Sequence, residues 1–390
     1  MEKWVTFLDV LKTPIRNGLT KPKGIRGTGV KMIAMGEIFA KARISDMEMD
    51  RVPVTEKEMA NCGIEAGDLL FARQSLVLEG AGKCSIVTEV SEPTVFESHL
   101  IRARIDKEKA DPYFIFYYFN SSHGRENIKT IVEQVAAAGI RGSDLVKLSI
   151  PCPEVSEQRR VARILRSIDE RIENNEKIND NLQQQASALF AQYYEQASDT
   201  VPFTSVIQIL GGGTPKTGNP LFWNGNVPFF TPKDVGAPYT LTTEKTITED
   251  GLDHCNSQIY PVNTVFVTAR GTVGKVGMPG VPMAMNQSCY ALVGKNIDQL
   301  MVYYYTLQTV QALKHKASGA VFDAITTRDF ETETIRLIAD DAAAEFLSVA
   351  TPMFGQVLSN SIENQRLAEL RDTLLPKLMS GEIDVSDIRL

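Results

Sequence analysis

The clearest pattern in the chain is a heptad repeat of apolar positions within residues 156–195, which predicts one long helix. Spacings of four and three residues alternate without a break, and two of the ten positions are asparagine. The series is Val161, Leu165, Ile168, Ile172, Asn175, Asn179, Leu182, Ala186, Leu189 and Tyr193. Such spacing is typical of a coiled coil. Ser156 is expected to cap the N-terminus of this helix.

The same pattern recurs 185 residues further along, with both asparagines at the same places. The second series is Phe346, Ala350, Met353, Val357, Asn360, Asn364, Leu367, Arg371, Leu374 and Leu378. Asp341 falls where Ser156 stands and is expected to cap this second helix. The second helix pairs with the first most easily by turning back, which makes the pair antiparallel. Asn175 is then expected to face Asn364, and Asn179 to face Asn360, which fixes the register.

The repeat extends into the segments that precede each helix. Residues 111–118 resemble residues 298–305, and both are predicted to form short capped helices rich in aromatic residues that belong to the core. The turn from Phe71 to Lys83 likewise resembles the turn from Val267 to Lys275, with Arg73 matched to Arg270. The predicted fold class is α+β. Two α/β domains in tandem repeat are separated by two long helices that pair as an antiparallel coiled coil. The expected segments are 1–150 for domain 1, 151–197 for the first helix, 198–340 for domain 2, and 341–390 for the second helix and tail.

Composition places the chain among ordinary globular proteins. Hydrophobic residues make up 43% and charged residues 23% of the 390 residues, and no run is apolar enough to span a membrane. The acidic start Met1-Glu2 does not suit a secretory signal. Five scattered cysteines without a CxxC pair favour reduced thiols in a cytoplasm.

The net charge of −7 is unevenly distributed. Residues 1–150 carry a formal charge of +1, whereas residues 341–390 carry −4. Between Asp9 and Glu37 lies a basic run with no acid inside it. The run consists of Lys12, Arg16, Lys21, Lys23, Arg26 and Lys31. Affinity for phosphate depends on such local clusters, so the acidic total does not exclude a nucleic-acid partner.

No motif in the sequence predicts catalysis. Gly27-Thr28-Gly29 lacks the third glycine of a dinucleotide fingerprint, and the segment Gly271–Lys275 lacks the spacing of a P-loop. The four histidines are isolated and have no metal-ligand partner at the spacing of one helical turn. A repeated two-domain chain without catalytic or metal-binding residues is better interpreted as a recognition subunit than as an enzyme.

Several longer motifs resemble the specificity subunit of type I restriction–modification systems, over essentially the whole chain. The strongest is the run from Leu370 to Ile383, and the segment from Ile150 to Asp169 is similar to the family's central helix. Gly212-Gly213-Thr214-Pro215, the segment from Thr231 to Asp234, and Arg270-Gly271 with Gly274-Lys275 resemble elements of its target-recognition domains. Domain 1 departs from the pattern because no Gly-Gly-Thr-Pro stands near its start.

The resemblance implies a DNA-recognition subunit that is not itself an enzyme. Each domain would read one half of a bipartite double-stranded DNA target. The helices would space the halves and dock two methyltransferase subunits. Those partners would bind S-adenosylmethionine, so no cofactor is expected in this chain, and a restriction motor–nuclease subunit would join for cleavage. The alternative is a coiled-coil assembly scaffold without direct DNA recognition.

Arginine and lysine in repeat-equivalent or Gly/Pro-marked turns are the candidates for DNA contact. Arginine can bind guanine through two hydrogen bonds, whereas lysine mostly binds phosphate. A solvated surface role is the alternative for each. The candidates are Lys21, Lys23, Arg26, Lys31, Arg73, Lys83, Arg141, Lys216, Lys233, Arg270, Lys275 and Arg328.

Overall fold

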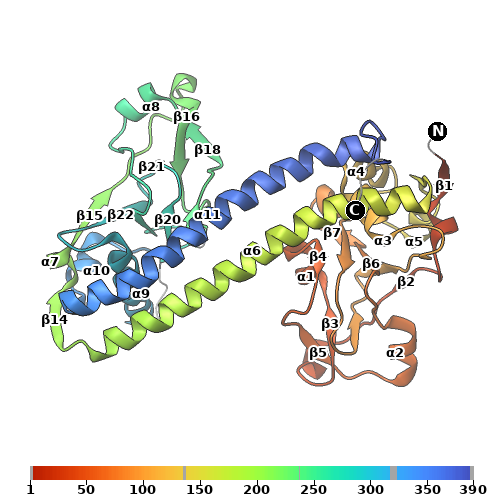
Figure 1. Cartoon of the computed structure of the whole chain (residues 1–390), viewed down its shortest axis with the longest axis horizontal. Helices are drawn as coiled ribbons and strands as arrows, with labels where there is room; N and C mark the ends of the chain where they lie inside the picture. Colours follow the sequence, from red (N-terminus) through yellow and green to blue (C-terminus); the bar gives the residue numbers. More distant parts are fainter. Residues whose placement is uncertain (1–2, 135–137, 237, 317–322, 387–390) are drawn as a thin grey trace. The chain divides into compact units, whose positions relative to one another are not determined.

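A computed structural model describes residues 3–134, 138–236, 238–316 and 323–386 (Figure 1). The chain forms two compact units. Unit 1 consists of Met1–Arg171 and Leu367–Leu390, and unit 2 consists of Ile172–Arg366. The long helices α6 (Val155–Gln196) and α11 (Asp340–Met379) each contribute a segment to both units.

Unit 1 contains short strands and helices before α6. Its strands are β1 (Trp4–Thr6), β2 (Arg16–Asn17), β3 (Val30–Ile33), β4 (Arg43–Ile44), β5 (Asp50–Val52), β6 (Leu69–Ala72), β7 (Gln74–Ser75), β8 (Cys84–Val87), β9 (Thr94–Phe96), β10 (Leu100–Ala103), β11 (Glu133–Gln134), β12 (Ala138–Gly139) and β13 (Ser149–Pro151). Its helices are α1 (Met35–Ala40), α2 (Glu56–Cys62), α3 (Pro112–Asn120), α4 (Ser122–Lys129) and α5 (Gly142–Leu145).

Unit 2 repeats this organisation between α6 and α11. Its strands are β14 (Asp199–Pro202), β15 (Ile207–Gly211), β16 (Trp223–Phe230), β17 (Tyr239–Thr240), β18 (Lys245–Ile247), β19 (Val265–Thr268), β20 (Val276–Pro279), β21 (Ala284–Met285), β22 (Cys289–Gly294) and β23 (Thr334–Leu337). Its helices are α7 (Phe203–Val206), α8 (Glu249–Asp253), α9 (Gln299–Lys316) and α10 (Thr327–Glu331).

The five-stranded sheets of the two units have the same topology. Unit 1 has a five-stranded sheet in the order β2-β10-β6-β8-β4, and unit 2 has one in the order β15-β22-β19-β20-β17. In both, the last pair is parallel and the other pairs are antiparallel. A three-stranded sheet, β5-β3-β9 or β18-β16-β21, accompanies each. The predicted tandem repeat of α+β character is therefore confirmed.

The two aromatic segments form core helices, as predicted. The Asp111 carboxylate caps α3 by accepting hydrogen bonds from the N–H groups of Tyr113 and Phe114, at 3.0 and 3.1 Å. Pro112 at the first helical position needs no such partner. The aromatic side chains of α3 and α9 lie within the hydrophobic cores of their units. They are thus packing residues and do not form an exposed platform for stacked bases.

The helix pair is antiparallel, as predicted, and its middle is polar. The Asn175 side-chain amide donates to the Asn364 side-chain oxygen at 2.8 Å. The Asn360 amide donates to the Asn179 side-chain oxygen, also at 2.8 Å. These are the two pairs expected from the repeat. Asn175 and Asn360 are almost fully buried, so an unpaired amide in either place would be costly.

The expected helix caps were wrong for both long helices. The carbonyl of Glu154 already accepts from the N–H of Gln158, and α6 begins at Val155. Ser156 therefore lies inside the first turn. At the second helix the carbonyl of Ala339 accepts from Ala343, which places Asp341 inside the first turn as well. Acidic side chains are still present in both first turns, where their negative charge interacts favourably with the helix dipole.

Candidate nucleic-acid interface

Backbone hydrogen bonds define which turn residues correspond between the two units. In unit 1 the Ala72 N–H donates to the Lys83 carbonyl at 2.9 Å, where β6 meets β8. In unit 2 the Thr268 N–H donates to the Lys275 carbonyl at 3.0 Å, where β19 meets β20. Ala72 therefore corresponds to Thr268, and Lys83 to Lys275.

The residue after β6 and the residue after β19 are each held by two backbone hydrogen bonds, one through the N–H group and one through the carbonyl. The Arg73 N–H donates to the His99 carbonyl at 2.8 Å, and the Arg73 carbonyl accepts from Ile140 at 2.9 Å. Ala269 makes the same two bonds, because its N–H donates at 2.7 Å to a loop carbonyl and its carbonyl accepts from Ile325 at 2.9 Å. Arg73 thus corresponds to Ala269, and the match of Arg73 with Arg270 was wrong by one residue.

A clamped glycine closes the turn in each unit. Gly82 and Gly274 have φ of +66° and +71°, a left-handed conformation that glycine adopts at no steric cost. The Arg125 guanidinium donates to the Gly82 carbonyl at 2.9 Å. The Lys314 ammonium donates to the Gly274 carbonyl at 2.8 Å. These two cations hold the turns in place, and sequence inspection did not single them out.

In unit 2, four further loops join this turn into one cluster. The Thr214 hydroxyl donates to Gln287, which connects the Gly-Gly-Thr-Pro segment to the loop before β22. The Thr272 hydroxyl donates to the Pro232 carbonyl at 3.1 Å, which adds the loop after β16. An isolated β-bridge between Arg270 and Ala324 adds the segment before α10. We call these connected loops the unit 2 loop cluster: residues 211–216, 231–234, 269–275, 286–288 and 323–328.

All five basic residues predicted for domain 2 lie in the unit 2 loop cluster. Lys216, Arg270, Lys275 and Arg328 are exposed, and their side chains make no ion pair with the described residues. Lys233 is 79% exposed and lies 3.6 Å from a glutamate oxygen. The cluster therefore presents cations to solvent, as binding to phosphate or to guanine edges requires.

Unit 1 has a counterpart of the Gly-Gly-Thr-Pro segment, which sequence inspection did not find. The Leu19 N–H donates to the Phe96 carbonyl at 2.8 Å, and the Gly213 N–H donates to the equivalent Met285 carbonyl at 3.2 Å. An added Cβ at Gly18 would lie only 2.1 Å from that Phe96 carbonyl oxygen, so no larger residue fits there. The unit 1 segment shares only this glycine and Thr20 with the unit 2 segment. Two identical residues are too few to identify the counterpart from the sequence.

Three of the six residues of the basic run in unit 1, Lys21, Arg26 and Lys31, are paired with acids outside the run. The Lys21 ammonium lies 2.8 Å from a Glu58 oxygen, and its side chain is only 12% exposed. Arg26 lies 2.8 Å from an Asp50 oxygen. Lys23 is exposed on a short turn, and its side chain makes no ion pair with the described residues.

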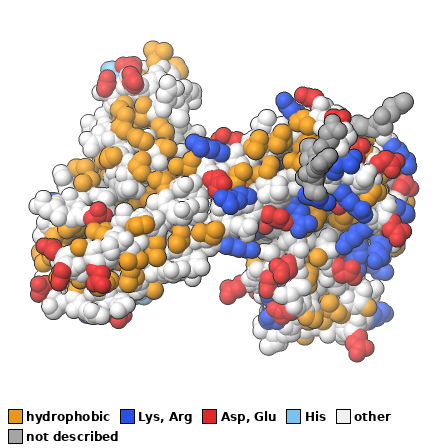
Figure 2. All heavy atoms as spheres, viewed as in Figure 1, with side chains coloured by type: hydrophobic (Ala, Val, Ile, Leu, Met, Phe, Trp, Pro, Cys, Tyr) orange, Lys and Arg blue, Asp and Glu red, His pale blue; other side chains and the backbone are white. Residues whose placement is uncertain are grey.

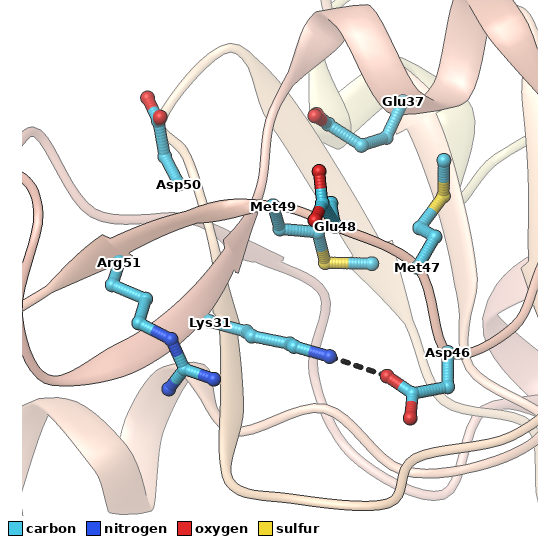
Figure 3. A pocket seen from close by; sticks show the side chains of 8 residues that line it. All are labelled: Lys31, Glu37, Asp46, Met47, Glu48, Met49, Asp50 and Arg51. Atoms are coloured by element: carbon cyan, nitrogen blue, oxygen red, sulfur yellow. Dashed lines mark hydrogen bonds and ion pairs between the residues drawn. The ribbon is translucent and has the colours of Figure 1, made fainter. Parts of the chain in front are cut away.

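Lys31 lies in an open pocket of about 760 Å³ between β3 and the segment around β5 (Figure 3). Its ammonium points to Asp46 and also lies 3.1 Å from Glu92. The Lys31 hydrogen bond holds the pKa of the Asp46 carboxyl below its usual value. Four carboxylates and two cations line this pocket. Its negative balance opposes the entry of a phosphate.

The remaining unit 1 candidates lie near the turn that contains Gly82. The Lys83 ammonium donates to the Phe39 carbonyl at 3.0 Å and lies over that ring, and burial lowers its pKa. Arg141 lies 2.7 Å from a Glu133 oxygen, with both side chains more than half exposed. The Arg73 side chain makes no ion pair with the described residues.

The turn differs in length between the units. Seven residues separate Gln74 from Gly82, whereas three separate Arg270 from Gly274. The longer unit 1 loop exposes three consecutive apolar side chains, and that of Leu76 is 98% exposed. The other two are Val77 and Leu78. An exposed apolar tip of this kind is typical of a surface that meets a partner.

The visible faces of the two units differ in charge (Figure 2). Basic and acidic side chains are interspersed over unit 1, whereas apolar and uncharged side chains dominate unit 2 in this view. Within the described residues, no group of three or more His, Cys, Asp or Glu is arranged to hold a metal ion. The described cysteines are free thiols.

The fold and the loops define a class of protein with tandem recognition domains. The same backbone hydrogen bonds build the same turn twice, and different side chains project from it. A model of the type I restriction modification DNA specificity domain matches residues 15–184 and 197–348. The chain belongs to this family.

Two relatives that align with this chain over most of their own length are specificity subunits. The specificity subunit of the type I restriction enzyme HindI from Haemophilus influenzae is 24% identical, over 83% of this chain and 88% of that protein. The specificity subunit of the type I restriction enzyme MjaIX from Methanocaldococcus jannaschii is 20% identical, over 86% and 82%.

A solved structure shares the fold over nearly the whole chain. It is the crystal structure of the S subunit of a type I restriction-modification system from M. genitalium. It aligns with a TM-score of 0.63 at 13% identity, over 97% of this chain and 96% of the other.

Proposed function

We propose that this chain is the sequence-specific double-stranded DNA recognition subunit of a type I restriction–modification complex, in which each unit reads one half of a bipartite target. One observation carries the proposal. The unit 2 loop cluster and its unit 1 counterpart share their backbone frame, while the projecting side chains differ. Side chains read the edges of bases. Two units with the same backbone frame and different side chains are therefore suited to bind two half-sites of different sequence.

The partners in this proposal supply the chemistry. Two methyltransferase subunits dock on the helix pair and bind S-adenosylmethionine, and a motor–nuclease subunit joins for cleavage. This chain then acts as a recognition subunit without a catalytic role or a cofactor of its own. No helix in the described part of the chain combines the length and apolarity needed to cross a membrane. We place the complex in the cytoplasm, where its DNA lies.

A coiled-coil assembly scaffold is the competing function. It accounts for the helix pair and the acidic total, but it gives no reason for the exposed cations of the unit 2 loop cluster. Salt-dependent binding of the purified chain to duplex DNA, alone and with its methyltransferase partner, separates the two. For a recognition subunit, the logarithm of the binding constant falls linearly with the logarithm of salt concentration, with a slope of about −0.9 per phosphate contact. A scaffold shows no DNA binding in either form.

Methylation mapping of DNA from cells that carry the complete system tests the bipartite target. We expect methylated adenines within one split sequence whose two halves differ. A methylation pattern without a fixed spacer, or with one continuous target, would contradict the proposal.

A further inference from the structure

The structural correspondence between the two units places Gln74 and Arg270 at the same position. Gln74 on β7 is paired with Gly139 on β12. Arg270 forms its β-bridge with Ala324. In both cases the preceding residue is the one whose N–H and carbonyl are both bonded to neighbouring segments.

Both side chains are exposed and unoccupied. Gln74 and Arg270 make no side-chain hydrogen bond or ion pair with the described residues. Their backbones are nevertheless held firmly, because they follow the doubly bonded residues Arg73 and Ala269 and precede the clamped glycine turns. A polar side chain on a rigid strand end, with no partner among the described residues, is suited to read a ligand.

The two residue types have complementary recognition chemistry. In the major groove a glutamine amide pairs with adenine, donating to N7 and accepting from the N6 amino group. An arginine guanidinium donates both of its hydrogen bonds to O6 and N7 of guanine. Few side chains can read one base through two hydrogen bonds, and both positions carry one.

We propose that Gln74 and Arg270 are equivalent specificity-determining residues, with Gln74 reading an adenine in one half-site and Arg270 a guanine in the other. This inference rests on the proposed function, since it requires that the loops meet DNA. Two neighbouring features support it. The apolar tip at Leu76 follows Gln74 on the same loop, and the exposed Lys275 follows Arg270 on its turn, where it can bind phosphate.

The test uses the chain in complex with its methyltransferase subunit. Methylation of a duplex library with randomised half-sites gives a base-preference profile for the unaltered complex and for each variant. We expect Gln74→Arg to change one position of one half-site from adenine to guanine. We expect Arg270→Gln to make the reverse change in the other half-site. Loss of one two-bond contact changes relative preference by roughly 5- to 150-fold.

Gln208→Arg is the matched control. Gln208 is also exposed and follows the first residue of β15, away from the unit 2 loop cluster, so the same gain of charge there should leave both profiles unchanged. Circular dichroism and copurification with the methyltransferase subunit show which variants fold. If Gln74→Arg does not fold, Arg270→Gln and Gln74→Ala test the same inference, and Gln74→Ala should flatten the preference at the adenine position.

The outcomes separate this inference from the proposed function. An unaltered complex that methylates without any sequence preference contradicts the proposed function itself. A bipartite profile that none of the folded variants alters contradicts only the pairing of Gln74 with Arg270. A uniform loss of activity on all sequences also contradicts it, because the loss of a phosphate contact weakens binding to every sequence alike.

Discussion

A buried ion pair between the two long helices offers a sharp test of the packing in unit 1. The Arg371 guanidinium lies 2.9 Å from one Asp169 oxygen. The Tyr117 hydroxyl donates to the other oxygen at 2.6 Å, and burial raises the pKa of this hydroxyl, which keeps it a donor. The Asp169 side chain is 8% exposed and that of Arg371 is 30% exposed. We predict that Arg371→Met destabilises unit 1 and that Asp169→Asn relieves part of the loss.

The magnitude follows from burial and from the partners that remain. Breaking a fully buried pair by removing one partner costs about 3–5 kcal/mol. Because Arg371 is partly exposed, water replaces some of its contact, and we expect about 2–3 kcal/mol for Arg371→Met. Asp169→Asn keeps an acceptor for Tyr117 and leaves Arg371 bonded to Asp372, so about 1 kcal/mol is expected. The double variant removes both charges of the pair, and the coupling energy should be about 1.5–2 kcal/mol.

Urea unfolding of the full chain measures these values. Unit 1 contains Trp4 and unit 2 contains Trp223, so a Trp223→Phe background leaves fluorescence that reports on unit 1. Lys377→Met is the control, since Lys377 is an exposed residue on the part of the same helix that belongs to unit 1, and its loss should stay within about 0.5 kcal/mol. Additive effects of Arg371→Met and Asp169→Asn would refute the reasoning, because a shared buried contact requires them to couple.

Four further predictions follow from the described contacts. Asn179→Leu should cost about 1–3 kcal/mol in urea unfolding because it leaves the Asn360 amide short of a partner, and adding Asn360→Leu should recover most of it. At pH 8, mass spectrometry should find a thiol reagent on half-buried Cys255 of the native chain but not on the other four cysteines, whose pKa values are raised by burial. Lys275→Ala should weaken binding to all duplexes alike and reduce the salt slope by about 1, whereas Lys31→Ala should leave both unchanged. One added heptad in both long helices lengthens each by about 10.5 Å, so methylation of a DNA series should favour a spacer about three base pairs longer, and an unchanged optimum would contradict a spacing role.

The helix pair could be predicted closely from the sequence because its periodicity is local and strict. Heptad spacing determines which side chains face inward, and two asparagines in each series leave few registers that pair all four. The helix starts were less predictable. A cap depends on where the chain enters the helix, and the residues Glu154 and Ala339 that precede the first turns carry no capping signal.

The candidate DNA contacts were less predictable because ion pairs join residues that are far apart in the sequence. The basic run contains no acid, yet Lys21 pairs with Glu58 and Arg26 pairs with Asp50. Only the fold brings α2 and β5 to those residues. A run of like charge in a sequence therefore predicts a basic surface only if no other segment neutralises it.

The dipeptide Ala-Arg, which occurs as Ala72-Arg73 and as Ala269-Arg270, explains the error in matching Arg73 with Arg270. A sequence comparison aligns like residues and places gaps where lengths differ, whereas the backbone hydrogen bonds align Arg73 with Ala269. The shift of one residue reverses the side of a strand on which a side chain lies. The residue equivalent to Arg270 is therefore Gln74, whose uncharged side chain carries no sign of a DNA contact in the sequence.

The two units show that one fold accommodates opposite core chemistry at one position. By the repeat, Tyr117, Asp169 and Arg371 of unit 1 correspond to Tyr304, Phe354 and Ala186 of unit 2. There Tyr304 and Phe354 meet edge to face, with ring centroids 6.0 Å apart, and Ala186 is fully buried. Since an apolar cluster fills this place in unit 2, the ion pair is not required for the helices to pack. The ion pair instead makes the two ends of the helix pair chemically different, because the unit 1 end contains a charged contact and the unit 2 end an apolar one. A packing that exchanged the two ends would leave Asp169 and Arg371 unpaired in an apolar core.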